Sequence, residues 1–360
     1  MRITGASFPT PHFIQVSSNP AVWDQQARFA QIHAGGANQA LDRLNGLLDA
    51  ATSQADRVNA FEQTYRELAQ WRYDLSQRSD GQRPGATPES YRTPIGRGAA
   101  TDAFGKGTHR DGDVRMDSQG KLFGGTETPA SRLADRLADI AAARFDAEAP
   151  DAEVLQNKVR LPDGSTVNGN QIHRGRSAAV MRNVPEDVKD FYCTLTGTEA
   201  DRKALQQAAF TNLAGLEAQR ASGRTDLLED PAARRAFVEA EYFIYQGPEY
   251  QRGGDASIRA LLVAAHTRVF DAPVKLPQDI DVMAYVASQQ DFYAHVERQQ
   301  TVLTTEAPAA QAEIAQPGIA QSGIAQPGIA QPGIAQSGIA QGAAHAAGAA
   351  TRRTAGPERG

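Results

Sequence analysis

The stretch Gly247-Pro248-Glu249-Tyr250-Gln251-Arg252-Gly253-Gly254-Asp255 is the part of the sequence that decides the fold assignment. Apolar residues recur at helical spacing on both sides of it, over residues 231–246 and 256–270. Asp230-Pro231 also places a good N-cap before a proline at the first helical position. The stretch is therefore predicted to connect two packed helices of a mainly helical protein.

The end of this connection has the composition of an anion site. Gly253 and Gly254 come directly before a helix, where free backbone N–H groups and the helix dipole attract negative charge. Glycines let a phosphate approach the backbone closely, and Arg252 can add a bidentate, permanently charged partner. Two plainer interpretations stay open, a structural glycine-rich turn or a helix whose first amides are capped by Asp255.

Further helices are predicted on both sides of this pair. Residues 21–78 carry two apolar stripes at helical spacing, and Ser53 with Asp56 three residues later indicates a helix start between them. The other segments with helical periodicity are residues 130–145, 199–221 and 279–298.

Two segments interrupt the helical pattern. Asp163-Gly164 separates two short extended runs within residues 158–172, which predicts a β-hairpin. Residues 79–127 are dense in Gly, Pro, Asp, Arg and Thr, and we expect long irregular connections there. The predicted architecture is therefore mainly α, a helical bundle with a small β-hairpin and an extra lobe.

The two ends of the chain differ in composition from the rest. Residues 1–20 have no apolar period and are predicted to be disordered. Residues 314–342 repeat Gly-Ile-Ala-Gln-Pro/Ser, in which Pro or Ser recurs too often for a helix and the apolar content is too low for a core. The predicted parts are a flexible start (1–20), one domain (21–300) made of N-terminal helices with an upper lobe (21–130) and a core (131–300), and a disordered repeat tail (301–360).

The composition argues against several classes of protein. The 360 residues carry a net charge of -5, so we expect no basic surface that would hold nucleic acid. The single cysteine cannot form an internal disulfide, and no apolar run approaches the roughly 20 residues that cross a bilayer. The N-terminus lacks a Sec-type signal pattern, and Arg2 stands where N-myristoylation requires glycine. A soluble protein without a direct membrane anchor is predicted.

The remaining reactive side chains have plainer interpretations. Cys193 could act as a nucleophile beside His173 or His295, but lone cysteines most often behave as small buried apolar residues. The histidines show no i,i+4 pair and no cysteine neighbour, so no metal site is predicted. The acidic segment 109–113 lacks the ligand count of a calcium loop, and the basic stretch 173–183 is interpreted as a solvated face that could border a cleft.

The run from Tyr242 to Val296 resembles the C-terminal part of the AvrB family of plant-pathogen type III effectors. The motifs that carry the resemblance are P-x-x-Q-R-G at residues 248–253, an alanine-rich helix after it, Leu-Pro before D-I-D/E-x-M at 279–283, and an acidic or amide pair followed by Phe292. Looser similarity lies upstream, with F-E…W-R at 61–72, T-P…S-x-L-A at 128–134 and G-N-x-I at 169–172. The resemblance thus covers roughly residues 20–298 and is specific at 248–283.

This resemblance implies a divergent Fic/Fido-like fold with a cleft between the helical core and a small extra lobe. The cleft would hold a nucleotide or a nucleotide sugar of the UDP- or dTDP-rhamnose type, and would clamp an extended peptide of a host plant immune regulator. By motif, Arg252 matches the cleft arginine, Asp279 the cleft acid and Thr128 the cleft threonine, while Gly253 and Gly254 would lie against the phosphates. Residues 1–20 would be the secretion segment, with a possible type III chaperone as partner, and the protein would act in the host cytoplasm.

The activity that the resemblance implies is glycosyl (rhamnosyl) transfer to a host Ser or Thr. Arg252 would neutralise the diphosphate leaving group, and Asp279 would orient or deprotonate the acceptor hydroxyl. The Fic signature H-P-F-x-D/E-G-N-G-R-x-x-R is absent, so a Fic-type base is missing and AMP or UMP transfer is the weaker candidate activity. Two non-catalytic interpretations also stay open: an effector that only binds host proteins and alters their signalling, and a structural ion pair between Arg252 and Asp279.

Overall fold

The computed structural model describes residues 2–8, 21–77, 87–182 and 188–303. Across these residues it contains nine α-helices and three small antiparallel sheets, which confirms the prediction of a mainly α protein. The predicted repeat tail, apart from residues 301–303, and residues 9–20 lie outside the described residues. The prediction of disorder over 1–20 is wrong for residues 2–8: they include the 3-10 helix η1 (Gly5–Ser7), and Ile3 and Phe8 are buried in the main core. The side chain of Asn38 holds this segment, because its amide accepts the N–H of Ile3 at 3.0 Å and donates to the Ile3 carbonyl at 2.8 Å. Among the described helices, none has both the length and the apolar content that spanning a membrane would require.

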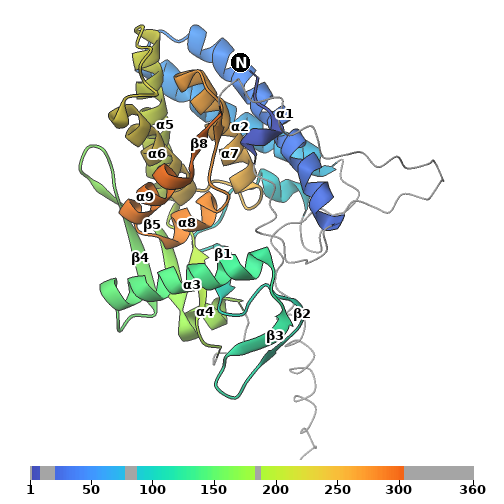
Figure 1. The fold of residues 1–360 in the computed structure, drawn as a ribbon. Helices are drawn as coiled ribbons and strands as arrows, with labels where there is room; N and C mark the ends of the chain where they lie inside the picture. The colour runs from blue at the N-terminus through green and yellow to red at the C-terminus, as the bar shows by residue number, and fades with distance from the viewer. Residues whose placement is uncertain (1, 9–20, 78–86, 183–187, 304–360) are drawn as a thin grey trace, which may run out of the picture.

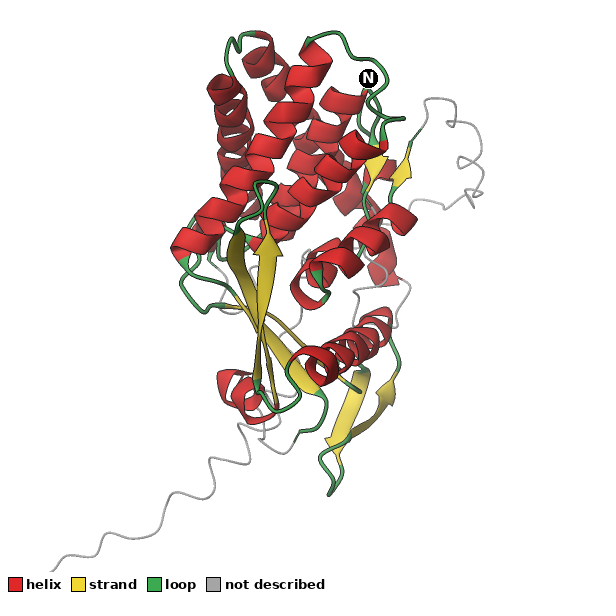
Figure 2. Cartoon of the chain, turned by 90° about the vertical axis from the view of Figure 1, so that its left-hand side faces the viewer, coloured by secondary structure: helices red, strands yellow, loops and turns green. Residues whose placement is uncertain are grey.

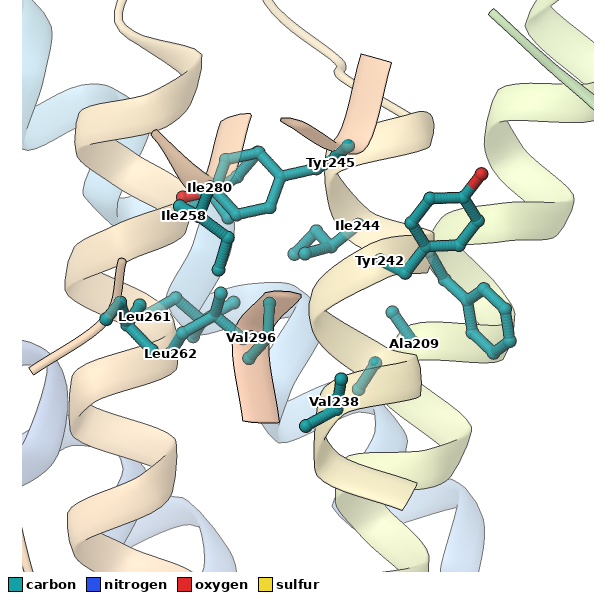
Figure 3. Packing of buried hydrophobic residues seen from close by; sticks show 14 of the residues in the cluster. Ala209, Val238, Tyr242, Ile244, Tyr245, Ile258, Leu261, Leu262, Ile280 and Val296 are labelled. Carbon is teal, nitrogen blue, oxygen red and sulfur yellow. The ribbon is translucent and has the colours of Figure 1, made fainter. Parts of the chain in front are cut away.

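A helical bundle forms the larger half of the molecule (Figures 1 and 2). Its helices are α1 (Ala21–Asp49), α2 (Gln54–Gln77), α5 (Glu199–Ala221), α6 (Pro231–Gln246), α7 (Gly254–Phe270), α8 (Ile280–Val286) and α9 (Gln289–Gln299). Helix α7 is buried on all sides, as expected for a central helix whose apolar residues do not form a single stripe. Figure 3 shows its residues Ile258, Leu261 and Leu262 near Ile244 of α6 and Val296 of α9.

Local capping explains why several predicted helix starts are confirmed. The backbone N–H of Asp56 donates to Ser53 Oγ at 3.1 Å, at the start of α2. The N–H of Ala232 donates to Asp230 Oδ1 at 2.8 Å, at the start of α6. The single helix predicted over 279–298 is wrong, because the chain becomes extended at Ser288, whose hydroxyl caps a new helix, α9.

A four-stranded antiparallel sheet forms the smaller half and carries the predicted hairpin. The strand order is β1 (Ala100–Gly105), β6 (Phe191–Leu195), β5 (Thr166–Arg174) and β4 (Val154–Arg160). The turn between β4 and β5 is Asp163-Gly164, so that prediction is confirmed. Successive β6 residues point to opposite faces: Tyr192 joins the main core on the side of α3 (Pro129–Glu148), and Cys193 joins a smaller cluster with Ala178 of α4 (Gly175–Arg182).

The prediction of irregular structure over 79–127 is wrong from residue 100 onward. Strand β1 lies there, followed by the two-stranded hairpin of β2 (Asp111–Met116) and β3 (Leu122–Thr126). These strands are short, and β2 and β3 are mostly exposed, so the sequence shows no apolar alternation. A short pair of strands, β7 (Val274–Lys275) and β8 (Thr301–Val302), was not predicted either.

A polar joint fixes the sheet to the bundle. A β-carbon on Gly169 would lie 2.0 Å from Gln246 Oε1, so only glycine fits at this point of β5. That oxygen accepts the N–H of Asn170 at 2.9 Å, and the Asn170 amide donates to the carbonyl of Tyr285 at 2.9 Å. Because these groups are buried and hydrogen-bonded, the two halves of the molecule are held in a fixed relation near α8.

Candidate functional site

The backbone of the loop before α7 is held by a segment far away in the sequence. The N–H of Arg252 donates to Ser90 O at 3.1 Å, and the N–H of Gln251 donates to Thr93 O at 3.0 Å. In return, the N–H of Ile95 donates to Glu249 O at 2.7 Å. The segment that begins with the 3-10 helix η3 (Pro88–Tyr91) therefore sets the position from which α7 starts.

The two glycines at the start of α7 have different surroundings. Gly253 is the N-cap residue, with φ at 71° in the left-handed region, and a β-carbon there would lie 2.7 Å from Tyr91 Cδ1. A β-carbon on Gly254, by contrast, would meet nothing within 4 Å. Gly253 is therefore required by the fold, whereas Gly254 leaves open space beside the first turn of the helix.

Among the described residues, no side chain caps the N-terminus of α7. The N-cap residue makes no side-chain hydrogen bond, and Asp255 is turned elsewhere. Its carboxylate accepts from Tyr245 Oη at 2.8 Å and pairs with Arg259 Nη2 at 3.1 Å. The interpretation that Asp255 caps the first amides is therefore wrong, and within the described residues these amides have no side-chain partner.

Two arginines lie at this helix start without a charged partner among the described residues. Arg252 is half-buried, and no hydrogen bond or ion pair joins its guanidinium to another described group. Arg72 of α2 is 6% exposed, and its Nε and Nη1 are buried without any hydrogen-bond partner. Its Cζ lies 5.4 to 5.6 Å from the ring centroids of three aromatic residues, Phe29, Trp71 and Tyr91.

The charges around Arg72 do not neutralise it. Burial lowers the pKa of Arg72, and Tyr91 and Asp255 act in the opposite direction. Burial and the charge of Arg72 together lower the pKa of His33 to about 3, so that imidazole is neutral. The nearest carboxylate, Asp255, is already paired with Arg259. The N-terminus of α7 is therefore a site of net positive charge.

Asp279 lies in a second polar group that the sequence did not predict. Its carboxylate is buried; Oδ1 accepts from His295 Nε2 at 2.8 Å, and Oδ2 forms an ion pair with Nη2 of Arg136 on α3. Burial alone would raise the pKa of Asp279, but the His295 hydrogen bond and the charges of His295 and Arg136 lower it overall. A structural ion pair between Arg252 and Asp279 is therefore wrong.

A second acid, Asp281, two residues further on, interacts electrostatically with Asp255 and Arg259 of α7. Burial raises the pKa of Asp281 well above its usual range, the charge of Asp255 adds to this, and Arg259 opposes it. Arg259 also donates to Pro277 O at 2.7 Å and to Gln278 O at 3.0 Å. Arg259 thereby ties the start of α7 to the loop before α8. The second acid of the D-I-D/E-x-M motif was the signal that could have identified Asp281.

Thr128 is the N-cap of α3, and its hydroxyl both donates and accepts a hydrogen bond within the fold. The side chain is buried; Oγ1 donates to His109 O at 2.6 Å and accepts from the N–H of Ser131 at 3.1 Å. Ser131 Oγ in turn accepts the N–H of Thr128 at 2.9 Å, which completes a capping box. The geometry therefore gives no support to a ligand contact by Thr128.

Cys193 is a core residue. It is fully buried beside Ala178, and on the neighbouring strand it lies opposite His173. The ring of His173 is itself engaged, with Nδ1 at 2.6 Å from Ser177 Oγ. In the part of the chain that the structure describes, no three or more His, Cys, Asp or Glu side chains gather in a way that could hold a metal ion.

Comparison with known proteins assigns no family to the chain. No protein-family model matches it, and no curated protein sequence matches it. Two groups of residues in the structure bear on function: the cationic start of α7, with Arg252, Gly253 and Arg72, and the buried pair of Asp279 and His295.

Proposed function

We propose that this chain is a Fido-like transferase of the AvrB type, which binds the diphosphate of a nucleotide sugar at the start of α7. It would transfer the sugar, with rhamnose as the first candidate, to a Ser or Thr hydroxyl of a host plant immune regulator. The observation that carries the proposal is the guanidinium of Arg72, which is buried beside Gly253 with two nitrogens unpartnered.

Electrostatics favours an anion at this place. Burying a cation without a partner destabilises the folded protein by several kcal/mol, and stacking on aromatic rings offsets only about 2 kcal/mol of this penalty. The helix N-terminus adds roughly half a positive charge, and Arg252 adds a full one. Since Asp255 is already paired with Arg259 and the raised pKa of Asp281 favours its neutral form, these carboxylates offset only part of this charge. A diphosphate would satisfy the orphan donors and the excess charge together.

In the proposed reaction, the positive charge at the start of α7 stabilises the negative charge that develops on the leaving diphosphate. The acceptor oxygen bonds to the anomeric carbon while the bond from that carbon to the diphosphate oxygen breaks. The nucleoside diphosphate leaves with the bonding electron pair, and Arg252 with the α7 amides stabilises it. The proton of the acceptor hydroxyl passes to a base on the protein.

Ligand-dependent thermal stability is the first test. UDP or dTDP at about 100 times its Kd should raise the melting temperature by about 5 °C. Arg252→Ala should abolish this shift, whereas Arg115→Ala, which removes an exposed arginine of β2, should leave it unchanged. An equal shift in both variants would place the nucleotide elsewhere, and no shift in the wild-type protein would remove the support for a donor site.

Mass spectrometry of host proteins incubated with the chain and nucleotide sugars distinguishes the candidate activities. A mass increase of one deoxyhexose indicates rhamnosyl transfer, and a nucleoside monophosphate increment indicates nucleotidyl transfer. Nucleotide binding without any mass change indicates the non-catalytic effector. Delivery through a type III system is part of the same proposal, and a reporter fused after residue 20 should enter plant cells only from bacteria with a working secretion system.

A further inference from the structure

The hydrogen bond between Asp279 and His295 fixes the proton on one ring nitrogen. Asp279 Oδ1 lies 2.8 Å from His295 Nε2, and both side chains are almost fully buried, at 7% and 11% exposed. An ionised carboxylate can only accept a hydrogen bond, so Nε2 carries the hydrogen. In the neutral ring, Nδ1 then carries the lone pair.

The Nδ1 nitrogen of His295 is not used by the fold. Within the described residues it has no hydrogen-bond partner, in contrast to Nδ1 of His33, which lies 2.9 Å from a backbone carbonyl, and Nδ1 of His266, which lies 2.6 Å from another. Those two rings are held as ordinary core histidines. His295 is instead held through its other nitrogen, by a carboxylate, which is the arrangement that orients and strengthens a base.

Arg136 completes the group from the sheet half of the molecule. It extends from α3, is half-exposed, and contacts the second oxygen of Asp279. Its positive charge keeps the carboxylate ionised, and an ionised carboxylate stabilises the imidazolium that forms when His295 takes up a proton. The group therefore spans the boundary between α3 of one half and α8 and α9 of the other.

A short chain of contacts links this group to the start of α7. Arg259 binds Asp255 in the first turn of α7 and also binds the carbonyl of Gln278. Asp279 is the next residue in the chain, so Arg259 contacts both the first turn of α7 and the residue before the carboxylate that orients His295.

We infer that His295 is the general base of the transfer and that Asp279 is the positioning residue that holds it. The inference rests on the proposed function and deepens it. His295 Nδ1 takes the proton of the acceptor Ser or Thr hydroxyl as the oxygen bonds to the sugar. Asp279 keeps the hydrogen on Nε2 and stabilises the imidazolium, which afterwards releases its proton to solvent.

The first test needs no activity. In ¹⁵N-edited NMR spectra that report the two ring nitrogens of each histidine, the neutral form of the His295 ring should carry its hydrogen on Nε2 and none on Nδ1. Asp279→Asn should lose this fixed tautomer, because an amide can either donate to or accept from the ring. A neutral His295 ring that carries its hydrogen on Nδ1 in the wild-type protein would overturn the inference.

The second test compares transfer with donor binding. His295→Gln should lower the turnover number by about 10² to 10⁴-fold, while the UDP-dependent thermal shift stays as in the wild type. His109→Gln is the control, because the one hydrogen bond of that ring to a described residue is with the Ala103 carbonyl of β1, and its turnover should be unchanged. Added imidazole should restore part of the activity of His295→Ala, which a merely structural role would not allow.

The outcomes separate this inference from the proposed function. A wild-type protein that transfers no group with any donor contradicts the proposed function, and the inference with it. A wild-type protein that transfers, together with a His295→Gln variant that transfers equally well, contradicts the inference alone. If His295→Gln fails to fold, the tautomer of the wild-type ring and the Asp279→Asn spectrum still decide the question.

Discussion

Arg72 lies against Gly253, with its Nε 3.4 Å from the position that a β-carbon on Gly253 would take. The same position is 2.7 Å from Tyr91 Cδ1, and the backbone there is left-handed. The N-cap of α7 is therefore glycine for two independent reasons, conformation and space. Arg72 lies at ordinary contact distance from the same position, and because two of its nitrogens are unpartnered it brings an unpaired positive charge to the helix start.

Gly253→Ala should destabilise the protein, and Gly254→Ala should not. Alanine at 253 would combine a left-handed backbone, which costs about 1 to 3 kcal/mol, with a displaced Tyr91 ring. Alanine at 254 enters open space in the first turn of a helix, so its effect should stay within about 0.5 kcal/mol. Urea denaturation of both variants measures the difference, and equal stabilities would show that Tyr91 does not close over the helix start.

Glu241 should make the protein less stable as the pH rises. Its carboxyl is fully buried, both oxygens lack partners, and burial raises its pKa well above the ordinary value, with Arg259 opposing. The folded state therefore binds more protons than the unfolded state above pH 4.5, and stability falls there with increasing pH, by at most about 1.4 kcal/mol per pH unit.

Glu241→Gln tests this sign, because glutamine does not titrate. The variant should gain stability relative to the wild type at pH 7, and this gain should shrink toward pH 4. The control Glu67→Gln replaces an exposed carboxylate of α2 and should change stability by less than about 0.5 kcal/mol at both pH values. A gain that is independent of pH would mean that the pKa of the Glu241 carboxyl is the same in the folded and unfolded states.

His266 should make the protein less stable as the pH falls. Burial lowers its pKa from 6.5 to about 4, although a hydrogen bond to the Ala272 carbonyl opposes this. Below pH 6.5 the unfolded state binds the extra proton, so stability falls by about 1.4 kcal/mol per pH unit until about pH 4. His33 adds a loss of the same sign, because its pKa is about 3. His266→Leu should flatten the slope of unfolding free energy between pH 6.5 and 4.5, and an unchanged slope would contradict the buried neutral ring.

The helices could be predicted because their signals are local. The observed bounds of α5 and α6 match the predicted ones, since Thr198 and Asp230 cap them and their apolar faces repeat at helical spacing. Strand β6 was missed because all five of its residues are buried, so no alternation marks it. The turn at Ser288 was missed because the apolar spacing continues across it.

Only part of the candidate site could be predicted, because only part of it is formed by residues that are close together in the sequence. Arg252, Gly253 and Gly254 are neighbours in the chain, and the sequence alone indicated a helix start with an arginine. Arg72, Arg136 and His295 come from three different helices, α2, α3 and α9, and only packing brings them to α7 and α8. Asp279 was identified by resemblance, but its partners are set by tertiary structure.

Replacement of Arg72 by methionine should separate stability from ligand binding. The free protein should become more stable, by about 1 to 4 kcal/mol, because an apolar side chain of similar length removes a buried charge whose Nε and Nη1 are unpaired. The loss of the cation–π contacts of Arg72 with three aromatic rings would reduce this gain in stability by up to about 2 kcal/mol.

Arg144→Met is the matched control for this replacement. Arg144 is also buried, but its nitrogens are all bonded, to Glu148, Asn157 and the Val286 carbonyl. Its replacement should cost about 3 to 5 kcal/mol, because it leaves those partners unpaired. Arg72→Met should in addition reduce the thermal shift given by UDP or dTDP. A less stable Arg72→Met protein would mean that the aromatic cage suffices for the charge, and an undiminished nucleotide shift would show that the buried cation plays no part in holding the diphosphate.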